Sequence, residues 1–159
     1  MLGEMKVLLW QRDYERWENM ARKEPKNRVD IITVFLEHDK KILILKRSQK
    51  VKTMKTKWGG ISGYIEQEEP VNRALKEIAE ETGLKNENVT LIRIGEPLEA
   101  VESDDPKITW VVHPFLFRSN TDQIRIDWEH DEYRWINPKE IKNYETVPRL
   151  GDAFDSLLV

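Results

Sequence analysis

Three glutamates in one short segment have the type and spacing best suited to chemistry in this sequence. Glu80 and Glu81 follow Glu77 at distances of three and four residues. On an α-helix, which turns by about 100° per residue, the three fall within an arc of about 100°. Carboxylates this close repel one another, and their oxygens are the ligands that Mg²⁺ or Mn²⁺ prefers. The cluster therefore favours either a divalent-metal site or a helix face neutralised by cationic side chains.

Cationic side chains for the second alternative are present in the same segment. Arg73 lies four residues before Glu77, and Lys76 lies four residues before Glu80. Residues at this spacing form ion pairs on a helix surface. Spacing alone leaves the metal site and the ion-paired surface both open.

The helix that must carry these glutamates has recognisable ends. Pro70 suits a first helical turn and Gly83 suits a C-terminal cap, so we predict a helix from Glu69 or Pro70 to about Thr82. One apolar arc on this helix indicates that it packs on a core and exposes its acidic side. That arc is made of Val71, Ala74, Leu75, Ile78 and Ala79.

Strands on either side of the helix must support it. The apolar runs 29–36 and 41–45 flank a polar turn, which predicts a β-hairpin. Pro114 indicates an edge position or a bulge for the strand that contains it. Further strands are predicted at 89–94, 108–117, 124–127 and 133–136, and short helices at 138–144 and 151–158.

Composition excludes several classes of protein. The 159 residues, with 39% hydrophobic and 35% charged side chains, suit one soluble globular domain. A net charge of −3 argues against a dedicated nucleic-acid binder. The absence of cysteine rules out disulfides, a thiolate nucleophile and a cysteine-based zinc site. None of the three histidines, at 38, 113 and 130, has a partner at metal-ligand spacing.

We predict that the first 28 residues form an extension of this domain. A strand over 6–10 and a charged amphipathic helix after it would pack on the domain or on a second subunit, as in a homodimer. The apolar run 7–10 is too short for a secretory signal or a membrane span. We therefore expect a cytoplasmic protein that does not enter a membrane.

The segment around the glutamates resembles the signature box of the Nudix hydrolases. That box reads Gly, five residues, Glu, seven residues, then Arg-Glu-aliphatic-any-Glu-Glu-any-Gly-aliphatic. Residues 76–84 match every fixed position of its second half except the first, where Lys76 replaces arginine. Counting back seven residues reaches Glu68, and only four residues then separate it from Gly63, so the box is one residue short in its loop. If Glu69 is taken as the first glutamate instead, the spacing from Gly63 is the expected five residues, but the spacing to Lys76 is shorter than seven.

The resemblance implies a fold and a reaction. The fold is an α/β/α sandwich around a mixed β-sheet, with residues 29–159 as the Nudix hydrolase domain. The reaction is hydrolysis of a diphosphate linkage in a nucleoside diphosphate derivative, with Mg²⁺ as the cofactor and Mn²⁺ as a substitute. A small-molecule nucleotide is then the partner, and nucleic acid is disfavoured. A nucleotide-sensing domain that binds without hydrolysis is the alternative, although the complete glutamate cluster favours the enzyme.

The resemblance also implies roles for individual residues. The metal would be held by Glu77, Glu80 and Glu81 and by the main-chain carbonyl of Ser62, with Glu77 and Glu80 as catalytic residues. Glu77 is our first candidate for the general base, and acids at 129, 131 and 132 are alternatives. Candidates for the remaining contacts are Arg47 and Lys46 for phosphate, and Tyr64, Trp110 or Trp128 for stacking on a base.

Overall fold

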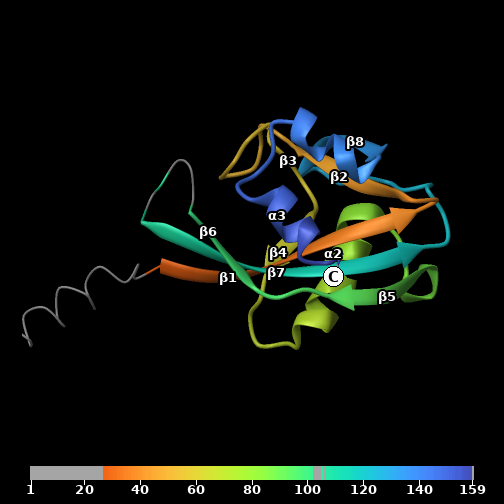
Figure 1. The fold of residues 1–159 in the computed structure, drawn as a ribbon, viewed down its shortest axis with the longest axis horizontal. Coiled ribbons are helices and arrows are strands. Elements are labelled where there is room, and N and C mark those ends of the chain that lie inside the picture. Colours follow the sequence, from red (N-terminus) through yellow and green to blue (C-terminus); the bar gives the residue numbers. More distant parts are fainter. Residues whose placement is uncertain (1–26, 102–104, 106, 159) are drawn as a thin grey trace, which may run out of the picture.

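The computed structural model describes residues 27–101, 105 and 107–158, which form one mixed sheet with helices on both faces (Figure 1). The strands are β1 (Asn27–His38), β2 (Lys41–Arg47), β3 (Trp58–Gly59), β4 (Ile61–Tyr64), β5 (Val89–Ile94), β6 (Leu98–Val101), β7 (Ile108–Ser119) and β8 (His130–Ile136). The α-helices are α2 (Pro70–Thr82) and α3 (Leu150–Asp155), and the 3₁₀ helices are η1 (Asn86–Asn88) and η2 (Pro138–Asn143). The strand and helix predicted within residues 1–28 lie outside the described residues.

The sheet combines parallel and antiparallel pairs. Its strand order is β3-β2-β1-β7-β5, while β4 pairs with β1, β6 with β7 and β8 with β2. The long central strands β1 and β7 run parallel, and the other pairs are antiparallel. The predicted mixed sheet is therefore confirmed.

Neighbouring residues of the central strands point to opposite faces of the sheet, and a helix covers each face. Val34 of β1 lies in the buried cluster that contains Ile78 of α2. Phe35 lies in the other cluster, where its ring meets Phe154 of α3 edge to face at 5.2 Å between centroids. This alternation is the side-chain period of two that any strand has. The two apolar layers confirm the α/β/α sandwich.

Local signals placed the helix and the hairpin correctly. α2 begins at Pro70, and the left-handed Gly83 ends it, with the Gly83 N–H donating to the Ala79 carbonyl at 3.0 Å. Asp39 and Lys40 join β1 to β2 with φ of 49° and 65°, the positive values that a two-residue hairpin turn needs. Among the described residues, no helix is long and apolar enough to span a membrane.

The strand predicted at 124–127 is wrong. The segment is irregular, and the Arg125 N–H donates to the Thr82 carbonyl at the end of α2, at 2.9 Å, rather than to a strand. Ile124 and Ile126 pack against the cluster beneath α2. Their alternation thus reflects packing under a helix, which a period-two pattern cannot distinguish from a strand.

An edge position, one of the two alternatives predicted for Pro114, is wrong, because β7 has neighbours on both sides. Pro114 lies where the pairing of β7 with β5 has ended and that with β6 has not begun. Its carbonyl accepts the Gly95 N–H at 2.9 Å in the turn between those two strands. The missing proline N–H therefore falls at a break in the neighbouring ladder and leaves no strand bond unmade.

Candidate active site

The acidic side of α2 lies against the backbone of β4. Packing of α2 on β1 and β4 brings Ser62 and Gly63 next to its glutamates. Glu77 and Glu81 are buried, whereas Glu80 is exposed. The three glutamates predicted to act together therefore occupy two environments.

Glu77 fits against Gly63 without space to spare. A Cβ atom at Gly63 would overlap the Glu77 carboxylate, so a side chain at this position would displace that carboxylate. The carboxylate also forms an ion pair with Arg73 one turn earlier in α2. Burial raises the pKa of Glu77; the Arg73 charge opposes that rise and Glu80 adds to it. The ion-paired arrangement that the spacing allowed is thus present at Glu77.

Glu81 is held by different groups. Its Oε2 accepts a hydrogen bond from the Ser62 main-chain N–H at 3.1 Å, and its Oε1 lies 3.4 Å from Nε2 of His130. Both side chains of the Glu81–His130 pair are 2% exposed. Burial raises the pKa of Glu81 well above the ordinary glutamate value, and the nearby Glu77 charge raises it further.

A hard divalent cation suits this cluster of carboxylates. The donors are all oxygens, which hard divalent cations prefer, and burial raises the pKa of both Glu77 and Glu81, with neighbouring carboxylates adding to the rise. Within the described residues, no three acidic or histidine side chains already converge as a ligand set. Glu77 contacts Arg73 instead, and Glu81 contacts the Ser62 N–H.

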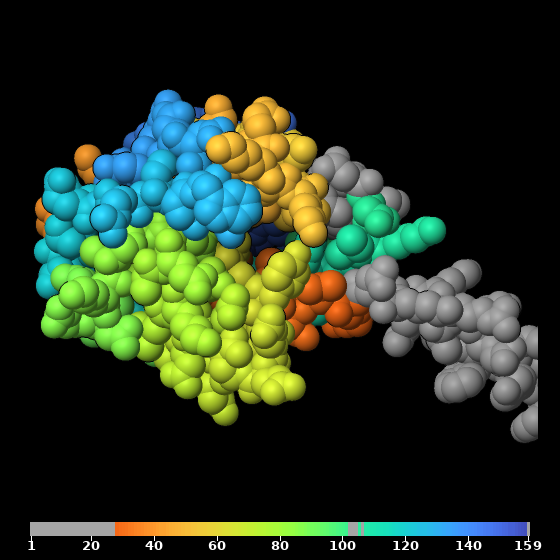
Figure 2. Space-filling view, turned by 180° about the vertical axis from the view of Figure 1, so that it is seen from behind, coloured from red at the N-terminus to blue at the C-terminus, as the bar shows by residue number. Residues whose placement is uncertain are grey.

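A cavity of about 210 Å³ lies beside these glutamates. Figure 2 shows the molecule hollowed here, between the yellow-green surface of α2 and β4, the orange segment after β2 and the blue segment before β8. One part of the wall is charged and another is apolar or aromatic. The lining residues are Ile31, Arg47, Thr53, Met54, Ser62, Gly63, Tyr64, Arg73, Glu77, Glu80, Trp110 and Glu129.

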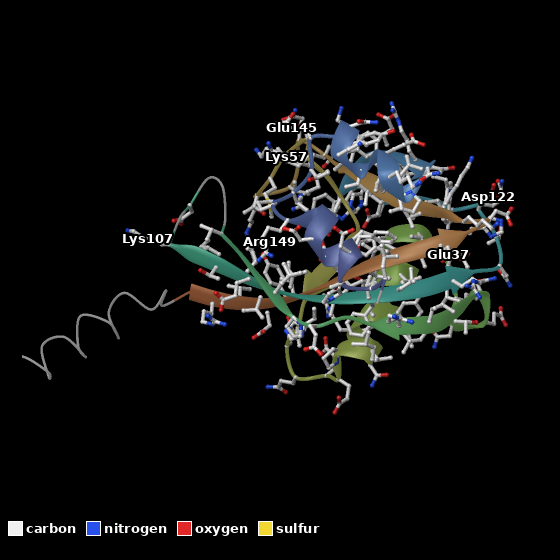
Figure 3. The ribbon with its side chains drawn as sticks, viewed as in Figure 1. Glu37, Lys57, Lys107, Asp122, Glu145 and Arg149 are labelled. Carbon is white, nitrogen blue, oxygen red and sulfur yellow. The ribbon has the colours of Figure 1, made fainter. Side chains whose placement is uncertain are left out.

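The two candidate phosphate-binding residues lie in different places. Arg47 lines the cavity, where its Nε donates to the Thr53 carbonyl at 3.1 Å and ties down the loop after β2. Lys46, the preceding residue of β2, does not line the cavity. Lys57, in the loop after β2, also lies outside the lining and pairs with Glu145 at 2.6 Å (Figure 3).

Of the acids outside α2 that are alternatives for the general base, the structure brings Glu129 to the cavity. Asp131 and Glu132 are absent from the lining. Glu129 is partly buried; burial raises its pKa, and the Asp127 charge adds to this. A carboxyl group with a raised pKa is better suited to accept a proton near neutral pH.

Two of the three candidate aromatic residues also line the cavity. The rings of Tyr64 and Trp110 are 6.1 Å apart between centroids. Tyr64 is 53% exposed, whereas Trp110 is buried. Trp128 is 61% exposed and lies outside the lining.

Sequence reasoning missed His130. Its Nδ1 lies 3.1 Å from Oδ1 of Asp127, and its other nitrogen faces Glu81. Burial lowers the pKa of His130, and Asp127 opposes this. The spacing of three residues from Asp127 was the available signal, but nothing local linked His130 to α2.

The protein is an α/β/α sandwich with a cavity that carboxylate and guanidinium groups line. The chain belongs to the Nudix family: the model of the NUDIX domain matches residues 25–157. The resemblance read from residues 63–84 is thereby confirmed, together with membership of the Nudix hydrolases.

Solved structures show the same fold. The MutT protein from Methanosarcina mazei Go1 is 23% identical, with a TM-score of 0.65 over 82% of this chain and 92% of that one. An Ap4A hydrolase from C. elegans is 17% identical, with a TM-score of 0.64 over 80% and 93%. The NUDIX domain of Shewanella oneidensis NrtR, complexed with ADP ribose, is 16% identical, with a TM-score of 0.62 over 87% and 94%. No curated protein matches the sequence.

Proposed function

We propose that this Nudix protein hydrolyses the diphosphate linkage of a nucleoside diphosphate derivative with Mg²⁺, for which Mn²⁺ can substitute. The observation that carries this proposal is that Glu77, Glu80, Glu129 and Arg47 line one cavity. A diphosphate carries several negative charges that repel an incoming hydroxide, so its hydrolysis needs cations at the phosphate oxygens and a group that accepts a proton from water. The cavity wall contains residues of both kinds.

Each residue has a proposed role. The oxygens of Glu77, Glu80 and Glu81 and the Ser62 carbonyl would hold the metal, which neutralises phosphate charge and lowers the pKa of water. Arg47 binds phosphate oxygens through its guanidinium group. Lys46 was the second candidate for binding phosphate. It does not line the cavity, so no contact among the described residues supports that role.

The general base is proposed to be a carboxylate of the cavity wall. Glu77 and Glu80 are the catalytic residues of the helix, and Glu77 is the first candidate for accepting the proton. Its ion pair with Arg73 holds this carboxylate in place and opposes the rise in its pKa that burial causes. Glu129 is the alternative, supported by its place in the lining and its raised pKa.

A small-molecule nucleotide is the proposed partner. The C. elegans relative is an Ap4A hydrolase, and the Shewanella domain was solved with ADP ribose. The aromatic part of the wall, with Tyr64 and Trp110, offers a surface for a base. The proposal also includes a cytoplasmic location and assembly into a homodimer.

The test is a panel of nucleoside diphosphate derivatives assayed for hydrolysis with and without Mg²⁺. Glu80→Gln removes a proposed ligand while keeping size, and we expect kcat to fall by at least about a hundredfold. Glu87→Gln, an exposed residue of η1 away from the cavity, is the matched control and should keep wild-type activity. Equal activity of Glu80→Gln and wild type would reject the proposed metal site.

The same panel separates the sensing alternative from the enzyme. Glu77 and Glu81 already contact Arg73 and Ser62, an arrangement that could also serve binding without turnover. Saturable nucleotide binding with no hydrolysis of any compound in the presence of Mg²⁺ would favour the sensor.

A further inference from the structure

Arg73 joins two parts of the site. Its Nη2 forms an ion pair with Oε1 of Glu77, and its Nη1 lies 3.3 Å from Oε1 of Glu68, in the loop before α2. The Arg73 side chain is 18% exposed, and that of Glu77 is 7% exposed. The guanidinium group therefore bridges the loop and the helix at the edge of the cavity that it lines.

Gly63 restricts Glu77 from the other side. The carboxylate lies against the β4 backbone so closely that any side chain at Gly63 would displace it. Contact with Gly63 on one side and with Arg73 on the other leaves the Glu77 carboxylate little freedom to rotate.

Lys76 does not help to hold the Glu77 carboxylate. It occupies the arginine position of the signature box, but its side chain is exposed and forms none of the ion pairs found among the described residues. Lysine also lacks the planar fork with which arginine can contact two carboxylates at once. Arg73 supplies that fork from one turn earlier in the helix.

We infer that Arg73 is a positioning residue, which holds the Glu77 carboxylate in the orientation used at the cavity by bridging it to Glu68. The inference rests on the proposed function, because Glu77 is a proposed ligand and catalytic group. It adds a residue for which the signature box assigns no role. Arginine rather than lysine is required at position 73, since the bridge needs two N–H groups at a set angle.

The experiment compares wild type with Arg73→Lys, which keeps the charge but removes the fork. Electron paramagnetic resonance of free Mn²⁺ measures metal affinity without substrate, and steady-state kinetics give kcat and KM. We expect Mn²⁺ affinity and kcat each to fall about 10- to 100-fold. KM should change by less than about threefold, because a positioning residue acts through Glu77 rather than on the substrate.

Matched variants control the comparison. Arg118→Lys alters an arginine paired with Glu37 outside the cavity lining and should behave like wild type. Arg73→Lys combined with Lys76→Arg should remain impaired, because residue 76 faces solvent. Glu68→Gln weakens one side of the bridge and should lower Mn²⁺ affinity to a smaller extent, which keeps the inference testable if Arg73→Lys fails to fold.

Three results would overturn the inference: wild-type Mn²⁺ affinity in Arg73→Lys, a raised KM with unchanged kcat, or full recovery in the double variant. Failure of the proposed function would look different. A wild-type protein that hydrolyses none of the nucleotides would reject the function, whereas the effect of Arg73→Lys on Mn²⁺ affinity would still be measurable.

Discussion

The main-chain N–H of Ser62 in β4 donates a hydrogen bond to the buried carboxylate of Glu81 in α2, at 3.1 Å. This bond attaches the helix to the sheet at the point where the predicted metal site lies. One N–H and a histidine ring supply far less solvation than water would give an ionised carboxylate. Glu81 is therefore costly to ionise without a further positive charge.

The contribution of Glu81 to the stability of the metal-free protein should fall as pH rises. Glu81 has a raised pKa in the folded state, so it binds more protons folded than unfolded. Its favourable contribution is fully present below the ordinary glutamate pKa and is lost as pH rises through the folded value. Above that value Glu81→Gln, which keeps an acceptor for the Ser62 N–H, should be more stable than wild type by about 1 kcal/mol or more. Urea unfolding in EDTA measures the free energies of unfolding of wild type and Glu81→Gln at pH 4.5 and pH 8. A difference between the two proteins that is the same at both pH values would contradict the prediction.

Mg²⁺ should restore the stability lost at high pH. An ion that binds only the folded state adds about 2.7 kcal/mol to the free energy of unfolding at a hundred times its Kd. We expect titration with Mg²⁺ or Mn²⁺ at pH 8 to raise Tm of the wild type and to leave Glu81→Gln nearly unchanged. Equal shifts in both proteins would show that the ion binds elsewhere.

Gly63→Ala should impair the site with little effect on the rest of the fold. The added methyl group displaces the Glu77 carboxylate, so kcat should fall by more than about tenfold. Gly59→Ala is the matched control, because its Cβ would meet Val147 at 3.6 Å, an ordinary contact. Kinetics and thermal melting of both variants test the difference, and similar kcat values in the two would refute the crowding at Gly63.

His130 should contribute more to stability than an exposed histidine. Its ring is 2% exposed between Asp127 and Glu81, so His130→Phe removes the imidazole contact of the buried Glu81 and of the partly exposed Asp127. We expect a loss of about 1–3 kcal/mol in the free energy of unfolding. His113→Phe, which alters a partly exposed histidine paired with Asp30, should cost less. Urea denaturation at pH 7 compares them, and equal losses would contradict the prediction.

Tyr64 should affect substrate binding more than Trp128 does. Tyr64 lines the cavity, and Trp128 does not. Removal of a ring that stacks on a base costs about 1–3 kcal/mol, which predicts a rise in KM of about tenfold for Tyr64→Ala. Tyr64→Phe should keep the wild-type KM, and Trp128→Ala should do so as well. If Trp128→Ala alone raises KM, the base binds outside the described cavity.

Local patterns were reliable where the interacting residues are close in sequence. Pro70 and Gly83 marked both ends of α2, and the polar turn at 37–40 marked the hairpin. The pattern at 124–127 misled because apolar residues under a helix alternate as a half-buried strand does. Pro114 misled because the break that accommodates it lies between β5 and β6, far along the chain.

The sequence by itself determined the acidic helix, its ends and the Nudix signature, since these depend on residues within one or two helical turns of each other. It also showed that Arg73 could reach Glu77. Only the tertiary structure decided that Gly63 makes room for Glu77 and that Glu129 and His130 arrive from a distant segment. Those contacts depend on the register and packing of the whole sheet, and a one-residue shift of register would turn the same side chains to its other face.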